Sequence, residues 1–325
     1  MERLKKIGVL TSGGDAPGMN AAIRGVVRSA VNNGIQVLGF EKGYAGLMAN
    51  EYRMMDKISV SDIVDRGGTI LYTARSKEFA TPEGINKAAE ILRSDGVEAL
   101  VVLGGDGTFR GAQELSKVGI NVIGIPATID LDIPCTEYTI GFDTAINTAM
   151  EGVDRIRDTS TSHERCSIVE VMGRNAGYIA AYTGISTGAE EIIIPEKNKY
   201  SDVNDIITRV KIANKKGKKH YIIINAEGIG NSANMAMMIE TATGIETRAT
   251  ILGHLQRGGS PTCMDRVYAS IMGCIAVEAL IAGKKNKLIV YRNGEFDAID
   301  IEEGLKMKRG SLDVFMKVAE DLESK

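Results

Sequence analysis

The chain has 325 residues, of which 44% are hydrophobic and 25% charged, close to the averages of globular domains. This length is enough for one large or two ordinary domains with sizeable cores. The 39 lysines and arginines nearly balance the 42 acidic residues, so the net charge of −3 gives no global attraction to nucleic acid or to an acidic membrane surface. Any anion-binding site must therefore be local.

The cysteines and the apolar runs exclude several protein classes. Cys135, Cys166, Cys263 and Cys274 are scattered without a Cys-x-x-Cys pair, so neither a zinc site nor a disulfide framework is indicated. The apolar run Ile7–Leu10 is too short for the core of a signal peptide, and no run approaches the roughly 20 residues of a membrane span. We expect a soluble cytoplasmic protein with reduced thiols.

Strand-like and helix-like segments alternate along the chain. In the first half the pattern predicts strands at 7–10, 37–40, 99–103 and 122–125, a turn at 43–46, and helices at 21–32, 82–94 and 110–117. The second half has strand-like runs at 167–172, 192–194, 221–224 and 288–291. This alternation predicts an α/β protein with two lobes, each a mainly parallel sheet covered by helices.

Two of the predicted strands in the first half run into acidic turns. The segment Pro126–Asp132 places Asp130 and Asp132 one residue apart, and on an extended segment both would point the same way and repel each other unless a metal or proton lies between them. The turn Gly104–Thr108 combines glycines, whose N–H groups can approach phosphate oxygens, with Asp106, which can hold Mg²⁺. Either pattern alone is also typical of an ordinary turn. Together they favour phosphoryl transfer.

The glycine-rich turn after the first strand does not match the common nucleotide motifs. Gly13 and Gly18 have the spacing of a Walker A loop, but Met19-Asn20 stands where Lys-Ser/Thr is required. A dinucleotide fingerprint fails as well, because Asp15 occupies its second glycine position, and Arg110 occupies the third in the other glycine turn. We therefore reject both a P-loop NTPase and a Rossmann nucleotide site.

Basic residues recur beside turns in the second half. Thr159–Arg165 is expected to be a polar loop, and Arg174 follows a strand end in Met-Gly-Arg-Asn-Ala-Gly. A single arginine is usually a surface residue, but repeated placement beside glycine turns suggests an anion cradle, since guanidinium matches phosphate in bidentate geometry. The candidates are Arg165, Arg174, Arg248 and Arg257 with His254, and Arg75 is a candidate phosphate clamp in the first half.

Eight motifs in order carry a family resemblance: LTSGGDAPGMN, GGDGT, TIDLDI, YTIGFDTA, RDTSTSHER, EVMGRNAG, AEG and TRATILGHLQRGGSPT. This set resembles the bacterial ATP-dependent 6-phosphofructokinases over nearly the whole chain. The resemblance implies a homotetramer that transfers the γ-phosphoryl of Mg-ATP to the 1-hydroxyl of fructose 6-phosphate in glycolysis. It also implies an ATP-binding lobe, residues 1–141 with 256–306, and a fructose 6-phosphate-binding lobe, residues 142–255 with 307–325.

The same resemblance assigns residue roles. Asp130 would be the general base with Asp132 beside it, and Asp106 would lie near Mg²⁺. Thr128 would contact the transferred phosphoryl group, whose charge Arg174 and the Gly14 N–H would stabilise. The ATP side would comprise Gly14, Tyr44, Arg75, Ser76, Gly107, Thr108 and Gly111. The sugar side would comprise Thr128, Asp130, Asp132, Met172, Gly173, Arg174, Glu227, His254 and Arg257, with Arg165 and Arg248 reaching in from a neighbouring subunit.

A regulatory site is also implied by the resemblance. Its residues would meet at a subunit interface and bind ADP as activator or phosphoenolpyruvate as inhibitor: Arg24, Arg28, Lys57, Arg157, Glu190, Lys216 and Lys218. Lys57 stands where the family usually has arginine, which keeps the charge but loses the bidentate fork. The alternative interpretation is a set of ordinary solvated cations.

Two positions depart from the family pattern. Ala127 replaces a glycine and Leu131 an asparagine. Pyrophosphate-using relatives typically carry lysine at position 127 and aspartate at position 107, whereas Ala127 and Gly107 are small and uncharged, which favours ATP. A pyrophosphate-dependent transferase and a non-catalytic sugar-phosphate sensor on the same fold remain alternatives. The retained acidic residues and Arg174 speak against the sensor.

Overall fold

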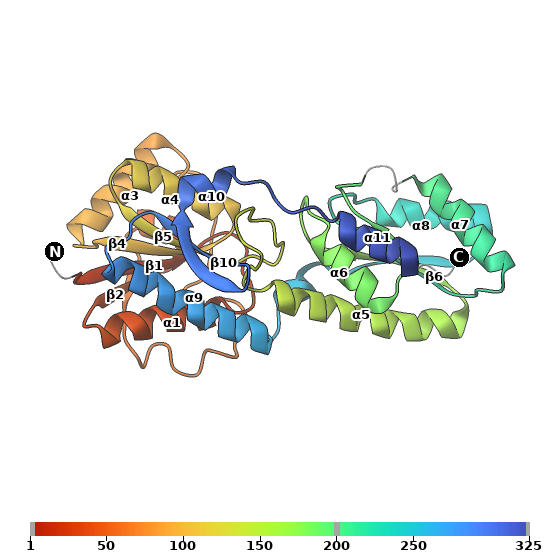
Figure 1. The fold of residues 1–325 in the computed structure, drawn as a ribbon, viewed down its shortest axis with the longest axis horizontal. Helices are drawn as coiled ribbons and strands as arrows, with labels where there is room; N and C mark the ends of the chain where they lie inside the picture. Colours follow the sequence, from red (N-terminus) through yellow and green to blue (C-terminus); the bar gives the residue numbers. More distant parts are fainter. Residues whose placement is uncertain (1–3, 198–201, 323–325) are drawn as a thin grey trace. The chain divides into compact units, whose positions relative to one another are not determined.

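The computed structural model describes residues 4–197 and 202–322, and the chain divides into two compact units. Unit 1 comprises residues 1–144 and 257–309, and unit 2 comprises residues 145–256 and 310–325 (Figure 1). The lobes expected from the sequence change at 141/142, 255/256 and 306/307, whereas the units change at 144/145, 256/257 and 309/310. The ligands assigned to the two lobes stay predictions.

Unit 1 is built on a sheet that has seven strands in the described residues, in the order β11-β10-β5-β4-β1-β2-β3. The five central strands pair in parallel, and the edge strands β3 and β11 are antiparallel to their neighbours. The strands are β1 (Lys6–Thr11), β2 (Gln36–Phe40), β3 (Tyr52–Met55), β4 (Ala99–Gly104), β5 (Asn121–Pro126), β10 (Lys287–Arg292) and β11 (Glu295–Asp300). The parallel pairing of the central strands confirms the expectation of a mainly parallel sheet. These strands are almost continuously apolar and buried, as is typical of a parallel sheet covered on both faces.

Helices cover both faces of this sheet. In Figure 1, α3 and α4 lie on one face, and α1 and α9 lie on the other. The core under α3 and α4 packs Leu92 and Phe109 against Leu100 and Val122 of the strands. The helices of unit 1 are α1 (Met19–Asn32), α2 (Gly43–Met48), α3 (Pro82–Ser94), α4 (Asp106–Lys117), α9 (Cys263–Ile281) and α10 (Ile301–Lys306).

Unit 2 has a smaller sheet, which within the described ranges has the order β7-β8-β6-β9 with parallel pairing throughout. Its core packs Ile206 and Ile239 from α7 and α8 against Ile168 and Ile223 of the strands. The strands are β6 (Cys166–Val171), β7 (Glu191–Ile193), β8 (Tyr221–Ala226) and β9 (Thr247–Ile251). The helices are α5 (Phe142–His163), which begins in unit 1, and α6 (Tyr178–Thr187), α7 (Val203–Lys215), α8 (Ser232–Thr243) and α11 (Asp313–Leu322), with the short 3₁₀ segment η2 (Gly253–Arg257).

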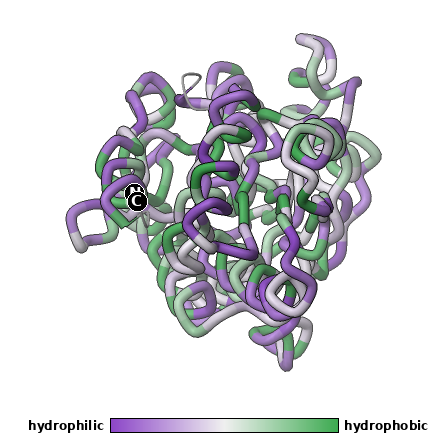
Figure 2. The backbone as a smooth tube through the Cα atoms, turned by 90° about the vertical axis from the view of Figure 1, so that its right-hand side faces the viewer, coloured by the Kyte–Doolittle hydropathy of each residue, from purple (hydrophilic) through white to green (hydrophobic). Residues whose placement is uncertain are grey.

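Hydropathy alternates along the helices. The tube in Figure 2 changes repeatedly between green and purple along its helical turns, as expected for helices with one face on a core and one in water. None of the helices in the described ranges is long and apolar enough to cross a membrane.

The polar loop expected at Thr159–Arg165 is wrong, because α5 (Phe142–His163) continues through most of it. The hydroxyls of Ser160, Thr161 and Ser162 donate to the carbonyls four residues earlier, at 2.8, 2.8 and 2.9 Å. This back-bonding satisfies the hydroxyls inside the helix, so a hydroxyl-rich run does not require a loop here.

Two further helix boundaries differ from the expectation. The segment Gly43–Gly46, expected as a turn, forms the start of α2. Helix α4 begins at Asp106, whereas the sequence pattern placed its start at Arg110. The earlier start puts Asp106 in the first helical turn, where a carboxylate interacts favourably with the helix dipole.

Candidate active site

The turn after β5 holds the predicted base in a buried position. Asp130 is 6% exposed and Thr128 is 7% exposed. The Thr128 hydroxyl accepts a hydrogen bond from the Asp130 backbone N–H at 3.2 Å, so the two residues are fixed to each other. A buried carboxylate beside a hydroxyl is a suitable arrangement for accepting a proton from a bound alcohol.

The segment that carries Asp130 and Asp132 is a turn and not an extended strand. The prediction that an extended backbone points both carboxylates the same way is therefore wrong about the backbone. Ile129 and Asp130 form a turn, and Leu131 has a left-handed φ of 51°. A leucine in this conformation costs about 1–2 kcal/mol, whereas asparagine tolerates it better. Leu131, which stands where the family usually has asparagine, therefore adopts a backbone conformation that is unfavourable for leucine. Arg309 donates a hydrogen bond to the Leu131 carbonyl.

Asp106 is a partly exposed carboxylate in the first turn of α4. Its side chain is 32% exposed, and its Oδ2 lies 2.8 Å from Nε of Arg110 in the next turn of α4. The described residues contain no cluster of three or more side chains suited to a metal ion. Magnesium in kinases is generally held by one or two carboxylates together with substrate phosphates and water, so the exposed face of Asp106 fits that ion.

The loop between β1 and α1 brings Gly14 and Arg257 together within unit 1. Arg257 Nη1 donates to the Asp15 carbonyl at 3.1 Å, and a Cβ on Gly14 would lie 2.6 Å from that same nitrogen. The loop is also tied to α4, because the Thr108 hydroxyl donates to the Ser12 carbonyl at 3.0 Å. Glycine at position 14 thus leaves room for a guanidinium beside an exposed stretch of backbone.

Among the residues predicted to lie on the nucleotide side, Tyr44 is buried and packs against Phe79 and α4. Its ring stacks on Phe79 with centroids 3.9 Å apart, and its hydroxyl donates to the Thr108 carbonyl at 2.8 Å. Burial raises the pKa of Tyr44, so the phenol keeps its proton. A Cβ on Gly111 would lie 2.8 Å from Phe79, which makes this glycine a point of close packing. Arg75 and Gly107 are exposed, and Ser76 is half-buried.

In unit 2 the turns after β6 and β8 are joined at Arg174. The Arg174 backbone N–H donates to Glu227 Oε1 at 2.6 Å, and Arg174 has a left-handed φ of 57°. Met172, one residue before Gly173, donates its N–H to the buried Gln256 at 3.2 Å. The guanidinium of Arg174 is thereby presented to solvent from a backbone fixed on both sides. His254 is exposed in η2.

Arg165 and Arg248 share one carboxylate. Arg165 Nε lies 2.7 Å from Glu246 Oε2, and Arg248 Nη2 lies 2.7 Å from Glu246 Oε1. The two guanidinium groups hold the pKa of Glu246 below its usual value, so this carboxylate stays charged at neutral pH. Glu246 therefore orients the two arginines for which the family resemblance implies a role in a neighbouring subunit's site.

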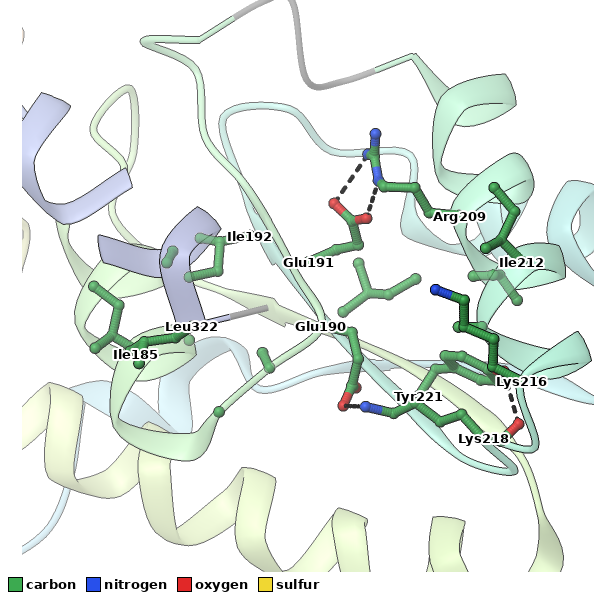
Figure 3. Close-up of a pocket in the computed structure, with 17 residues that line it drawn as sticks. Ile185, Glu190, Glu191, Ile192, Arg209, Ile212, Lys216, Lys218, Tyr221 and Leu322 are labelled. Atoms are coloured by element: carbon green, nitrogen blue, oxygen red, sulfur yellow. Dashed lines mark hydrogen bonds and ion pairs between the residues drawn. The ribbon is translucent and has the colours of Figure 1, made fainter. Parts of the chain in front are cut away.

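Three of the predicted effector residues line a cavity of about 330 Å³ in unit 2: Glu190, Lys216 and Lys218 (Figure 3). Lys218 Nζ and Glu190 Oε1 are 2.5 Å apart, and Figure 3 shows these side chains pointing toward each other. Arg157 is in the same unit and donates to the Thr187 carbonyl. The other three predicted effector residues, Arg24, Arg28 and Lys57, belong to unit 1.

Comparison with known proteins identifies the family. The family model described as phosphofructokinase matches residues 6–280. The chain belongs to the phosphofructokinase family. The matched stretch includes the turns after β1, β4, β5, β6 and β8, which carry the acidic and basic residues described above.

Relatives of this phosphofructokinase family member are similar along both units. It is 56% identical over 306 residues to "ATP-dependent 6-phosphofructokinase" of Clostridium botulinum (strain Loch Maree / Type A3), covering 94% of this chain and 95% of that one. The same figures hold for "ATP-dependent 6-phosphofructokinase 1" of Clostridium perfringens (strain 13 / Type A). The solved structure of phosphofructokinase from Saccharomyces cerevisiae matches with a TM-score of 0.85 and 34% identity, covering 98% of this chain but 47% of the yeast chain.

Proposed function

We propose that the protein is an ATP-dependent 6-phosphofructokinase that phosphorylates the 1-hydroxyl of fructose 6-phosphate in the cytoplasm. The observation that carries this proposal is the buried Asp130 in the turn after β5, in a chain 56% identical over 94% of its length to a relative with that name. The retained acidic turns and exposed arginines support an enzyme over a non-catalytic sensor.

Unit 1 supplies the base and the nucleotide side. Asp130 takes the proton of the 1-hydroxyl as the sugar oxygen attacks the γ-phosphorus, and Thr128 orients the transferred group. Asp106 would hold Mg²⁺, which when bound neutralises charge on the phosphate oxygens. The Gly14 N–H donates to the transferred group, in line with the general rule that phosphoryl transfer depends on positioning and electrostatics.

Most of the proposed sugar-phosphate ligands are residues of unit 2. Arg174 places positive charge on the transferred phosphoryl group, while Met172, Gly173 and Glu227 contact the sugar. His254 binds the 6-phosphate together with Arg257. In the proposed homotetramer, Arg165 and Arg248 serve a neighbouring subunit's site. Their shared partner Glu246 holds the two guanidinium groups beside each other, with Arg248 exposed and Arg165 half-buried, so both could act on one phosphate.

The choice of donor is the first test. Purified protein with fructose 6-phosphate is expected to turn over with ATP and not with pyrophosphate. Ala127→Lys is expected to weaken ATP use by at least about tenfold in kcat/KM, because position 127 is fully buried and a lysine there overpacks the turn after β5 and places a charge in its interior.

Ala127→Gly is the matched control, since it restores the family's usual small residue and should keep ATP activity within about twofold. Turnover of the wild type with pyrophosphate alone would reject the donor assignment. Absence of turnover with either donor would reject the kinase.

The cavity of Figure 3 supports a regulatory site for ADP or phosphoenolpyruvate, since it is lined by three cations, Lys216, Lys218 and Arg209, against two carboxylates, Glu190 and Glu191, which pair with Lys218 and Arg209. Arg157→Ala is expected to reduce the effector-induced shift of fructose 6-phosphate saturation, which for a typical allosteric coupling is about 5- to 150-fold, and to leave unregulated catalysis nearly unchanged. Arg155→Ala is the control, because Arg155 lies on the same helix but pairs with Glu151 at the surface. An effector response that is equal in the wild type and in Arg157→Ala would remove Arg157 from the site.

A further inference from the structure

Asp265, which no motif singled out, is a fully buried carboxylate in the first turn of α9. Within the described residues its side chain accepts four hydrogen bonds. The donors are the Tyr138 hydroxyl at 2.5 Å, the Gly141 N–H at 2.7 Å, and the Thr144 N–H and hydroxyl at 2.9 and 2.5 Å. Because four hydrogen bonds converge on one buried carboxylate, the positions of Tyr138, Gly141 and Thr144 relative to Asp265 are tightly fixed.

All of these donors belong to one segment, residues 138–144, which leads into α5. Asp265 therefore caps the first turn of α5 from a helix more than a hundred residues away in sequence. The N-terminal ends of α5 and α9 both favour a negative charge at this place. Burial and the neighbouring carboxylate raise the pKa of Tyr138, so its phenol keeps the proton that it donates.

Residues 138–144 are hydrogen-bonded to the turn that carries the proposed general base, Asp130. The Thr139 hydroxyl donates to the Thr128 carbonyl at 2.6 Å, and the Ile140 N–H donates to the Pro126 carbonyl at 2.9 Å. Since the Thr128 hydroxyl accepts from the Asp130 N–H, hydrogen bonds joined by short covalent stretches of the chain connect Asp265 to the proposed base.

The same segment also supports the loop between β1 and α1. A Cβ on Gly18, whose φ is 104°, would lie 2.7 Å from Ile140. A Cβ on Gly141, whose φ is 101°, would lie 2.7 Å from Ala16 and 3.3 Å from Ile129. Both glycines are needed for these close contacts and for their left-handed backbone. The loop that contains Gly14 and the turn that contains Asp130 therefore both contact residues 138–144.

We propose that Asp265 is a positioning residue for phosphoryl transfer, setting the Asp130 turn and the Gly14 loop relative to each other through residues 138–144. This inference rests on the proposed kinase function for its catalytic readout. An anchor that served folding alone would affect stability and leave the turnover of the folded protein unchanged.

The test compares substitutions that remove single hydrogen bonds. Tyr138→Phe removes one donor to Asp265 and keeps the ring, and Asp265→Asn keeps the size but turns one acceptor into a donor facing N–H groups. Tyr268→Phe is the matched control, because its ring lies 4.7 Å from that of Tyr138 while its hydroxyl interacts with Tyr291. Each variant is assayed for kcat, for KM and for amide hydrogen exchange of residues 127–132.

We expect kcat to fall by about tenfold in Tyr138→Phe and by about 10²-fold in Asp265→Asn, with KM for fructose 6-phosphate changing much less, since small misplacement of reacting groups has effects of this size. Hydrogen exchange in residues 127–132 should accelerate in Tyr138→Phe and not in Tyr268→Phe. Wild-type kcat and exchange in folded Tyr138→Phe would overturn the inference, even if Asp265→Asn did not fold. An inactive wild type would reject the kinase instead, and the exchange comparison would still decide whether Asp265 positions the turn.

Discussion

Replacing Asp130 by serine is expected to lower turnover by about 10²–10⁴-fold, the usual cost of losing a general base. Substrate binding should survive, because the proposed phosphate ligands of both substrates are other residues. The serine is smaller than aspartate and keeps a hydroxyl, so the buried position is not forced to hold an isolated charge. Steady-state kcat and KM with ATP and fructose 6-phosphate measure the effect.

Asp132→Ser is the comparison within the same turn. Asp132 is half-buried and does not share the Asp130–Thr128 hydrogen bond, so its loss should reduce turnover less. A fall of less than about tenfold in folded Asp130→Ser would show that Asp130 is not the base.

The Asp130→Ser chain also tests whether subunits share sites. Arg248→Ala should be inactive for a different reason, since it removes a ligand proposed to serve a neighbouring site. Mixed oligomers of the two chains should regain activity by forming some sites without either change. Verified mixed oligomers that stay inactive would argue against sharing.

The central strands and most helices of the first half of the chain were predictable from local sequence, whereas the helices after residue 117 and the edge strands β3 and β11 were not predicted. Apolar runs such as Ile7–Leu10 and Val122–Ile125 give buried parallel strands, and the Thr81 cap with Pro82 at the helix start marks α3. One segment was wrongly predicted as a loop because its polar side chains form hydrogen bonds within the helix. Ser160 and its neighbours bond back to the helix, so their polarity misleads a prediction based on composition.

The site was predictable where residues lie in motifs, and less so where they act through other residues. Glu246 and Phe79 have no local sequence signal, because their roles come from partners distant in the chain, such as Arg165 for Glu246 and Tyr44 for Phe79. The position of Asp130 followed from the strand before it, but the turn at Leu131 did not, since left-handed leucine is rare.

Arg174→Ala should have the second large effect on catalysis. The turn that carries Arg174 is held by the Glu227 carboxylate and by close packing of Gly228 against the Arg174 carbonyl, so the backbone should persist after the side chain is removed. The guanidinium is proposed to meet negative charge that grows during transfer, and loss of one such donor typically costs about 10²–10³ in kcat. KM for fructose 6-phosphate should rise much less.

Arg174→Lys separates charge from geometry. Lysine keeps the positive charge but loses the planar fork, so it should recover part of the lost turnover and not all of it. Asn175→Ala is the matched control on the next residue, which is also exposed and should stay within about twofold of the wild type. If Arg174→Ala raised KM and left kcat unchanged, Arg174 would be a binding residue that acts equally on ground state and transition state, and its proposed role in stabilising the transferred phosphoryl group would be wrong.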